Sequence, residues 1–432
     1  MNRRRFLSRS VPAFGFPFII KASALGLNGA GAPSNRISLG VLGVGSQGTS
    51  DMRAFLNHDD VRVSALCDVN TRHLERARGF IKERYGSDDV KVYSDFRELH
   101  RDASLDAILM ALPVHWHSIP AADAIRQGKH IYHEKPMGLS IEEAKFVRNE
   151  VRQKKVVFQF GTQQRSDLKF RWASELALNG CLGKVKEIQV GVPGGKSIPA
   201  FVEQPVPDYL DWNRWVGPAA LTPFHEGKLN RDNHENISNF SLGMISCWGI
   251  HHLDIAQWGN GTDATGPVSV EGMGEFPASG GGCDAVLNWK IRFEYAQAAP
   301  ITFVNENREG ILMGAKFIGE NAWVHVTRGK IAASDEALLR DPANKPGAMK
   351  VKLPVSIEHT RNFIDAIKSG TRSICDIESS VRSDALPQLA ALALKTQRKL
   401  HWDPVSETFG QDTEANALMA HRPLRGEWKL EG

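Results

Sequence analysis

The sequence contains few cysteines, and the five that it has are far apart. They are odd in number and none lies close to another in the chain: Cys67, Cys181, Cys247, Cys283 and Cys375. A disulfide framework or a zinc site needs cysteines at short, regular spacings, so the sequence predicts neither. Internal repeats and low-complexity segments are missing as well.

A strong charge of either sign is also missing. The chain has 53 basic and 49 acidic residues, a formal net charge of +4. Residues 1–32 hold five of the basic residues and no acidic ones, so the remainder carries 48 against 49, or −1. Neither a nucleic-acid partner nor a polybasic membrane patch is therefore expected.

The apolar run near the N-terminus is too short to span a bilayer. Residues 11–20 are interrupted by two prolines and a glycine, whereas a membrane span needs about 20 consecutive apolar residues. The run follows Arg3-Arg4-Arg5-Phe6-Leu7 and precedes Ala30-Gly31-Ala32. This order predicts a twin-arginine signal peptide over residues 1–32, the twin-arginine export machinery as a partner, and a periplasmic or otherwise exported location. An uncleaved signal that anchors the protein is the alternative.

A glycine-rich turn follows the first apolar strand of the remaining chain. Residues 37–44 are typical of a buried parallel strand, and Gly43-x-Gly45-x-x-Gly48 follows it directly before a helical segment. Gly43 permits a tight turn, Gly45 lets a pyrophosphate approach the backbone, and Gly48 lets the helix lie close to the strand. The helix N-terminus, with Ser46 and Gln47, would then face the phosphates.

An aspartate stands where such a site needs an acidic residue. A second strand-like run, residues 61–67, ends in Asp68, which follows Gly48 by twenty residues. A carboxylate at this point accepts hydrogen bonds from the adenosine ribose and repels a 2′-phosphate. The pattern therefore favours NAD over NADP as the cofactor.

Residues 36–160 alternate between strand-like and helix-like segments, which predicts a Rossmann domain with a parallel sheet between helices. Thr71 to Tyr85 has helical periodicity, and Ser140-Ile-Glu-Glu143 is a capping box that begins another helix. Further strands are expected at residues 90–93, 105–112, 130–133 and 156–160.

Two loops follow the carboxyl ends of these strands, where ligands bind in such folds. Pro113, His115 and His117 belong to the first and are expected to wall a nicotinamide ring, although this loop is equally compatible with a turn whose Ser118 caps the next helix. The second loop is His133-Glu134-Lys135-Pro136. Lys135 is a candidate acid/base for a substrate hydroxyl, although a lysine before a proline is more often an ordinary turn residue.

From about residue 184 the pattern changes to alternating strands, which predicts a mostly antiparallel open sheet. We therefore expect an α/β protein with a second α/β domain over residues 161–404, for substrate binding and oligomer formation, and a C-terminal tail over residues 405–432. Residues 205–239 are an irregular excursion over the surface. Trp212, Arg214, Trp215 and His225 in it are residue types that bind sugars.

His251 and Asp254 are expected one turn apart on a helix that begins near Trp248. Such a pair suits an oriented acid/base, half of a metal site or a hydrogen-bonded core pair. Since no third ligand is evident, no metal site is predicted.

Together these motifs resemble the glucose-fructose oxidoreductase and inositol dehydrogenase family, often called Gfo/Idh/MocA. The resemblance covers nearly the whole chain after residue 32. It depends on the glycine turn, Asp68, Glu134-Lys135-Pro136, Gly249-Ile-His251-His252-x-Asp254 and Trp402-Asp403-Pro404. The Glu-Lys-Pro triplet is the most specific of these motifs.

The resemblance implies hydride transfer between NAD and a carbohydrate, with Lys135 and His251 as catalytic residues. Glu134 and Lys135 join the cofactor-binding set, and a homo-oligomer is expected. The substrate is expected to contact Arg165, Trp212, Arg214, Trp215, His252 and Asp254.

One position departs from the family pattern. Members commonly carry an aspartate four residues before the histidine, and here that residue is Cys247. A thiol does not hold the same charge near neutral pH. Asp254 is one candidate to supply the charge, and weakened or different chemistry is the alternative.

The expected function is that of an NAD-dependent oxidoreductase acting on a sugar, polyol or sugar derivative. Outside the cytoplasm free cofactor is scarce, so the NAD is expected to stay bound and to be regenerated in each cycle. Two alternatives stay open: an NAD-dependent glycosidase that uses transient oxidation, and a non-catalytic carbohydrate-binding protein with a Rossmann fold.

Overall fold

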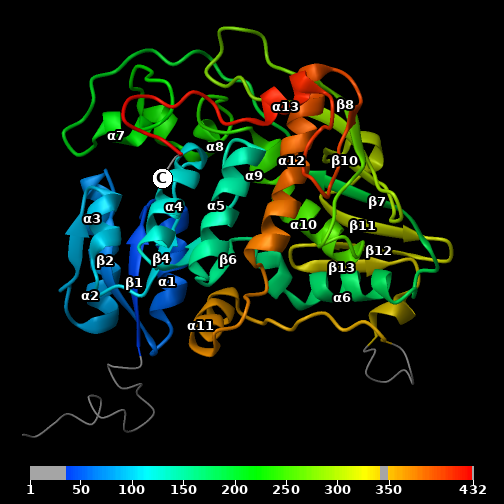
Figure 1. Ribbon diagram of the computed structural model, residues 1–432, viewed down its shortest axis with the longest axis horizontal. Helices are drawn as coiled ribbons and strands as arrows, with labels where there is room; N and C mark the ends of the chain where they lie inside the picture. The colour runs from blue at the N-terminus through cyan, green and yellow to red at the C-terminus, as the bar shows by residue number, and fades with distance from the viewer. Residues whose placement is uncertain (1–35, 341–348, 431–432) are drawn as a thin grey trace, which may run out of the picture.

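A six-stranded parallel sheet forms the centre of the N-terminal domain, at the left of Figure 1. Its strand order, β3-β2-β1-β4-β5-β6, is that of the Rossmann fold, as predicted. The order reverses between β1 and β4, which pair in parallel, and ligands bind at the carboxyl ends of strands near such a reversal. The strands are β1 (Ile37–Leu42), β2 (Val61–Cys67), β3 (Lys91–Tyr93), β4 (Ala107–Met110), β5 (His130–His133) and β6 (Phe158–Phe160).

The helices of this domain begin and end where the sequence places capping residues. The Asn70 side chain accepts hydrogen bonds from two N–H groups at the start of α2, and Gly86, with φ 72°, ends it. Ser140 accepts a hydrogen bond from the Glu143 N–H, so the predicted cap of α5 is confirmed. The helices are α1 (Ser46–Leu56), α2 (Thr71–Tyr85), α3 (Phe96–Arg101), α4 (Ser118–Arg126) and α5 (Ile141–Lys154).

One helix from the C-terminal part of the chain packs on the Rossmann sheet. This helix, α11 (His359–Ser369), buries Phe363 against the rings of Phe55 and Tyr132, with centroid distances of 6.1 and 5.9 Å. The Rossmann layer is therefore not continuous in the sequence, and residues 161–404 contribute to it.

The C-terminal domain has an eight-stranded sheet, at the right of Figure 1. Strands β7 and β10 pair in parallel and the other neighbours are antiparallel, which confirms the prediction. The strands follow one another across the sheet as β13 (Lys330–Ala333), β12 (Trp323–Thr327), β11 (Gly314–Gly319), β7 (Val185–Val192), β10 (Ile301–Asn305), β9 (Asn288–Glu294), β8 (Ser269–Glu275) and β14 (Leu400–His401).

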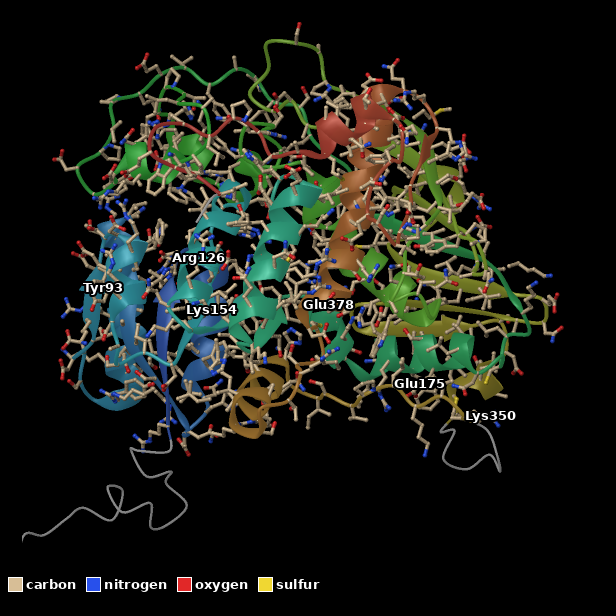
Figure 2. The ribbon with its side chains drawn as sticks, in the orientation of Figure 1. Tyr93, Arg126, Lys154, Glu175, Lys350 and Glu378 are labelled. Carbon is tan, nitrogen blue, oxygen red and sulfur yellow. The ribbon has the colours of Figure 1, made fainter. Side chains whose placement is uncertain are left out.

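Three helices cover one face of this sheet: α6 (Leu168–Leu178), α10 (Gly249–Gly259) and α12 (Ile377–Thr396). Alternate residues of β9 are buried toward them, namely Trp289, Ile291 and Phe293. Near its N-terminus α12 also contacts the Rossmann domain, where Arg152 of α5 donates to Glu378, labelled in Figure 2, at 2.6 Å. This ion pair is exposed and contributes little to stability.

The excursion and the C-terminal tail lie together above the carboxyl ends of the Rossmann strands (Figure 1). The tail includes α13 (Thr413–Met419), and its Arg425 donates to the Gly217 carbonyl at 3.0 Å. The short helices of the excursion and of the segment after it are α7 (Trp212–Val216), α8 (Arg231–His234) and α9 (Met244–Cys247).

The structure, a computed structural model, describes residues 36–340 and 349–430. The signal peptide predicted over residues 1–32 lies outside the described residues. Among the helices of the described ranges, none is long and apolar enough to cross a membrane.

Candidate active site

The glycine turn after β1 has the geometry that a bound pyrophosphate requires. Gly43 has φ +81°, and a Cβ on Gly48 would lie 1.9 Å from the Gly43 carbonyl oxygen, so both positions need glycine. A Cβ on Gly45 would instead have His73 Cε1, at 3.9 Å, as its nearest described neighbour. Gly45 therefore keeps open a space that a side chain would fill.

The N-terminus of α1 is free to bind an anion. Gly45 is its N-cap, no side chain of the described residues caps it, and its first turn, which holds Ser46 and Gln47, has no acidic residue. Unpaired N–H groups and the positive end of the helix dipole favour a phosphate at this point.

Asp68, at the end of β2, holds the glycine turn in place. One carboxylate oxygen accepts from the Val44 N–H at 2.9 Å, and the other accepts from the Asn70 N–H at 2.9 Å. Each carboxylate oxygen has a second lone pair, so the side chain can still accept ribose hydroxyls. The residues of this edge thus fit a dinucleotide.

A cavity of about 570 Å³ runs along this edge of the sheet, from the end of β2 to the end of β5. Its size is typical of a small-molecule site. Eight of the expected cofactor-binding residues line it: Gly43, Gly45, Ser46, Gln47, Asp68, Pro113, Glu134 and Lys135.

The two histidines expected beside the nicotinamide do not line this cavity. His115 is 5% exposed, and its Nε2 contacts the Trp215 carbonyl at 3.1 Å. His117 is 1% exposed and lies between the carbonyl oxygens of Leu112 and Pro136. The two histidines therefore hold the loop in place and do not line the cavity. The expectation that they wall a nicotinamide ring is corrected.

Ser118 does not cap α4 either. His117 is the N-cap and makes no capping hydrogen bond with its side chain in the described structure, whereas Ser118 donates to Glu143 at 3.2 Å.

The excursion supplies one wall of the cavity. Arg214 and Trp215 line it, and Arg214 donates to the Ser94 carbonyl at 3.2 Å, close to the ends of β2 and β3. Trp212 is 6% exposed and stacks on Trp215 with a centroid distance of 4.8 Å. Trp212 therefore supports Trp215 rather than facing a ligand. His225 caps the short helix after it by accepting from the Gly227 N–H at 2.9 Å.

Lys135 lies in the cavity wall at the end of β5. It is 6% exposed, and its ammonium donates to the carbonyl oxygen of Cys247 at 3.0 Å. An ammonium has three donors, so Lys135 retains capacity for a ligand.

His251, on α10, is 5% exposed and, like His115 and His117, is not among the residues that line the cavity. Burial, then the charges of Lys135 and Arg328, hold the pKa of His251 well below its ordinary value. The ring is therefore neutral near pH 7, and its Nδ1 has no hydrogen-bond partner in the described part of the chain. A neutral imidazole can accept a hydrogen bond from a substrate hydroxyl.

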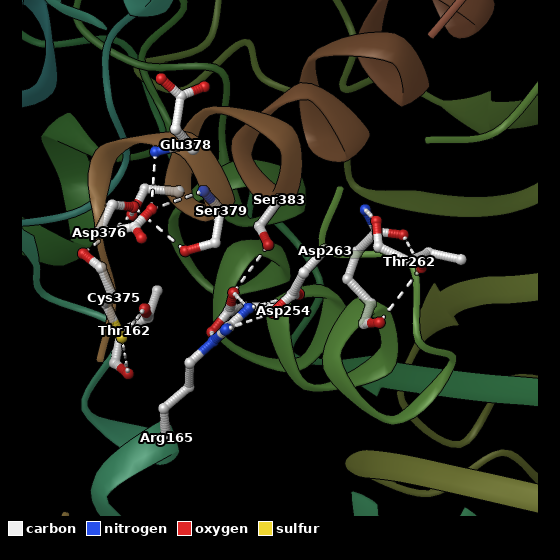
Figure 3. Close-up of polar contacts among 12 residues, drawn as sticks. Thr162, Arg165, Asp254, Thr262, Asp263, Cys375, Asp376, Glu378, Ser379 and Ser383 are labelled. Atoms are coloured by element: carbon white, nitrogen blue, oxygen red, sulfur yellow. Dashed lines mark hydrogen bonds and ion pairs between the residues drawn. The ribbon is translucent and has the colours of Figure 1, made fainter. Parts of the chain in front are cut away.

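Three residues expected to contact the substrate are buried in the protein interior instead. Arg165 donates to both oxygens of Asp254, at 2.7 and 2.8 Å, and also pairs with Asp263, as Figure 3 shows. Ser383 of α12 donates to the same Asp254 carboxylate at 2.7 Å. His252 is fully buried against Phe170. Arg165, Asp254 and His252 therefore have no face for a substrate, and the Asp254 carboxylate is engaged by Arg165 and Ser383.

Burial raises the pKa of two carboxyl groups of this region, those of Asp51 and Glu134. Burial and the neighbouring Glu134 raise the pKa of Asp51 well above its ordinary value. Burial likewise raises the pKa of Glu134, which Lys135 and Arg231 oppose. Gln163 donates to Glu134 at 2.7 Å and Gln47 donates to Asp51 at 2.9 Å.

Arg231, Glu235 and Trp428 are among the residues of the cavity wall that sequence reasoning missed. The first two come from the excursion. Their charges are evident in the sequence, but the segment has no helical or strand periodicity from which their position could be predicted. Trp428 comes from the tail and packs on Trp116 with a centroid distance of 4.8 Å.

No metal site is visible in the described ranges. Among residues 36–340 and 349–430, no group of three or more His, Cys, Asp or Glu side chains is placed to hold a metal ion.

Fold and site together define a two-domain protein with a dinucleotide cavity at the edge of a Rossmann sheet. The chain belongs to the Gfo/Idh/MocA oxidoreductase family. Residues 37–162 match its NAD-binding Rossmann fold, and residues 194–430 match its C-terminal alpha/beta domain. The predicted family and an NAD-binding Rossmann domain are thereby confirmed.

The relatives of known name include both a glycosyl hydrolase and a dehydrogenase. A glycosyl hydrolase family 109 protein of a Shewanella species is 33% identical over 128 residues, 28% of each chain. A myo-inositol 2-dehydrogenase of Thermotoga maritima is 28% identical over 41% of this chain and 49% of its own. The chain thus spans less than two thirds of these relatives.

Among solved structures, the WlbA dehydrogenase of Bordetella pertussis, in complex with NADH and UDP-GlcNAcA, has a similar fold. Its TM-score is 0.62 at 16% identity, covering 85% of this chain and 98% of that one.

Proposed function

We propose that the chain is an NAD-dependent oxidoreductase that acts on a CH–OH group of a sugar, polyol or sugar derivative. The observation that carries the proposal is the position of Lys135. It lines the same cavity as the glycine turn and Asp68. The names of the inositol dehydrogenase relative and of the UDP-GlcNAcA complex support a carbohydrate substrate.

NAD bound in the cavity would supply a hydride acceptor. The open space at Gly45 and the free N–H groups of α1 would hold its pyrophosphate, and Asp68 its ribose. As the neutral amine, Lys135 takes the proton of the substrate hydroxyl as the carbon is oxidised, and as the ammonium it returns that proton in the reverse direction. His251, as a neutral ring, accepts a hydrogen bond from the same hydroxyl and orients it.

The walls of the cavity favour retention of the cofactor. Trp215 from the excursion and Trp428 from the tail both line it, and Trp428 packs on Trp116. A retained NAD also suits an exported protein. Because the sequence predicts a twin-arginine signal over residues 1–32, we propose that the protein is exported, and we also propose that it acts as a homo-oligomer.

A second candidate is an NAD-dependent glycosidase. In this reaction the sugar is oxidised transiently to a ketone, the glycosidic bond breaks by elimination, water adds to the double bond that forms, and the ketone is reduced again. The glycosyl hydrolase family 109 relative favours this candidate. The same residues, Lys135 and His251, would act in both reactions.

The test is made on protein purified from a cytoplasmic preparation. Denatured protein is assayed for released NAD, and native protein is screened with a panel of sugars and polyols, myo-inositol and uronic acids included, for absorbance of NADH. Nitrophenyl glycosides are screened in parallel. NADH formation supports the oxidoreductase, whereas nitrophenol release without net NADH supports the glycosidase. Bound NAD with neither activity would favour a non-catalytic carbohydrate-binding protein.

A further inference from the structure

Three aromatic rings meet in the wall of the dinucleotide cavity, and one of them comes from the C-terminal tail. The Trp428 ring lies 4.8 Å from Trp116 and 5.9 Å from Phe96, between ring centroids, and Phe96 lies 5.8 Å from Trp116. All three residues line the cavity. We call Phe96, Trp116 and Trp428 the aromatic cluster. The Arg97 guanidinium lies 5.2 Å from the centroid of the Trp428 ring.

The aromatic cluster lies at the end of the cavity that Asp68 marks. The Asp68 N–H donates to the Tyr93 carbonyl at 3.4 Å, and Phe96 follows Tyr93 by three residues. Lys135 belongs to the other end, because it follows β5, and strands β1 and β4 separate β5 from β2 in the sheet. Asp68 and the aromatic cluster are thus neighbours, whereas Lys135 is farther along the cavity.

Hydrogen bonds of the tail hold Trp428 in this position. Arg425 donates to the side-chain and main-chain oxygens of Asn213, both at 2.8 Å, and its own N–H donates to the Pro218 carbonyl at 2.9 Å. Leu430, two residues after Trp428, is 7% exposed. The tail is therefore fixed on both sides of Trp428, and its ring is presented to the cavity by specific contacts.

The position of the aromatic cluster matches one part of a dinucleotide. In the proposed function the Asp68 carboxylate accepts the hydroxyls of the adenosine ribose, and the adenine is bonded directly to that sugar. A purine has flat, weakly polar faces, and contact of a base with an aromatic side chain is favourable whichever base is present. The nicotinamide must instead lie near Lys135, where the substrate hydroxyl gives up its proton.

We propose that Trp428 binds the adenine of NAD and that the C-terminal tail is therefore part of the dinucleotide site. The inference rests on the proposed function for one point, the placement of the adenosine ribose at Asp68. It is independent of which sugar is oxidised, and of whether the reaction is that of an oxidoreductase or a glycosidase.

The first experiment is a footprint of the wild-type chain, so it needs no variant and no turnover. Protein freed of nucleotide with charcoal is exposed briefly to hydroxyl radicals, and oxidation of the Trp428 peptide is quantified by mass spectrometry. Trp428 is half-buried and should react. ADP-ribose, which carries the adenosine end of NAD, is expected to abolish most of this oxidation. Nicotinamide mononucleotide, which carries the other end, should not.

Two residues calibrate the footprint. Trp323 of β12 is also half-buried but is not among the residues of the cavity wall, so neither nucleotide should change its oxidation. His73 lines the cavity and lies 3.4 Å from the Asp68 carboxylate, so ADP-ribose should protect it. Protection of His73 without Trp428 would overturn the inference about the tail alone. Protection of neither would overturn the placement of the ribose at Asp68 as well.

The second experiment measures affinity by isothermal titration calorimetry. Trp428→Ala should bind ADP-ribose at least about fivefold more weakly, since loss of one base–aromatic contact weakens binding by roughly 5- to 150-fold. Its affinity for nicotinamide mononucleotide should be unchanged. Trp428→Phe retains a ring and should lose less. Trp323→Ala makes the same change at a half-buried site outside the cavity wall and should match wild type.

Urea unfolding of each variant shows whether a loss of affinity reflects a loss of fold. Should Trp428→Ala not fold, Trp428→Phe and the wild-type footprint decide. ADP-ribose affinity equal to wild type in Trp428→Ala would overturn the inference, and so would protection of Trp428 by nicotinamide mononucleotide alone. The sugar screen tests the proposed reaction separately, because neither the footprint nor the titration involves a substrate.

Discussion

The Lys135 ammonium donates a hydrogen bond of 3.0 Å to the backbone carbonyl oxygen of Cys247. Lys135 follows β5 of the Rossmann sheet, whereas Cys247 ends α9 in the second domain. The proposed acid/base is thus positioned by a contact between domains. Because the acceptor is a main-chain atom, this contact does not depend on which side chain stands at position 247.

Lys135→Ala is expected to lower kcat by at least about 100-fold, the usual scale for loss of a general acid/base. The substitution does not change the glycine turn, which is proposed to bind the pyrophosphate, so the variant should retain its NAD. Sugar-dependent NADH formation and the NAD content of the denatured protein are measured together. Turnover near the wild-type rate would remove Lys135 from the mechanism.

Gly45→Ala and Gly48→Ala form a matched pair at the glycine turn. The Cβ at position 45 enters open space in the cavity, so this variant should fold normally but retain at least about tenfold less NAD, a loss of about 1.4 kcal/mol in binding. At position 48 the Cβ meets the Gly43 carbonyl at 1.9 Å, which should cost roughly 1–3 kcal/mol of unfolding free energy. Urea unfolding and NAD content distinguish the two; equal behaviour would contradict the assigned roles.

The fold was largely predictable because its signals are local. The alternation of strands and helices, the Ser140 cap and the glycine turn each depend on a few neighbouring residues, and the alternation led to the correct sheet types. The packing of α11 on the Rossmann sheet could not be predicted from a local pattern. It joins residues that are more than 200 positions apart in the sequence.

The residues of the site could be predicted only where a motif places them just after a strand. Gly45, Asp68 and Lys135 follow strands directly, so the topology brings them to one edge. Arg165 and Asp254 carry residue types suited to substrate binding, but they meet each other in the interior, and sequence spacing does not report burial. Glu235 and Trp428 were missed because irregular segments carry them to the cavity.

The buried pair of Arg165 and Asp254 gives a stability prediction. Asp254→Ala leaves a guanidinium that is almost wholly buried without its main partner and should lower the unfolding free energy by about 3–5 kcal/mol. Replacing both residues, as Arg165→Met/Asp254→Leu, should cost less than the single change, since no buried charge is left unpaired. A double-mutant cycle from urea unfolding measures the difference. Additive costs would show that the two side chains do not depend on each other.

Asp384, on α12, gives a prediction of how stability depends on pH. The side chain is fully buried, and burial raises its pKa to about 7, although it accepts hydrogen bonds from the Met137 N–H at 3.1 Å and from Gln388. The folded protein therefore binds this proton more tightly than the unfolded chain, in which an aspartate has a pKa of about 4. Its stabilising contribution is complete below about pH 4 and is lost as the pH rises through about 7.

Asp384→Asn removes this titration. A difference of about three pKa units corresponds to about 4 kcal/mol, so the unfolding free energy of wild type minus that of the variant should fall by up to that amount from acid to neutral pH. Urea unfolding at intervals from pH 4 to 8 measures it, and the exposed Asp208→Asn serves as a control with the same change of charge. Because all other titrating groups are shared, they largely cancel in the difference. A difference that stays constant over this range would mean that Asp384 is ionised in the folded protein at low pH, and that Met137 and Gln388 stabilise its charge more than burial opposes it.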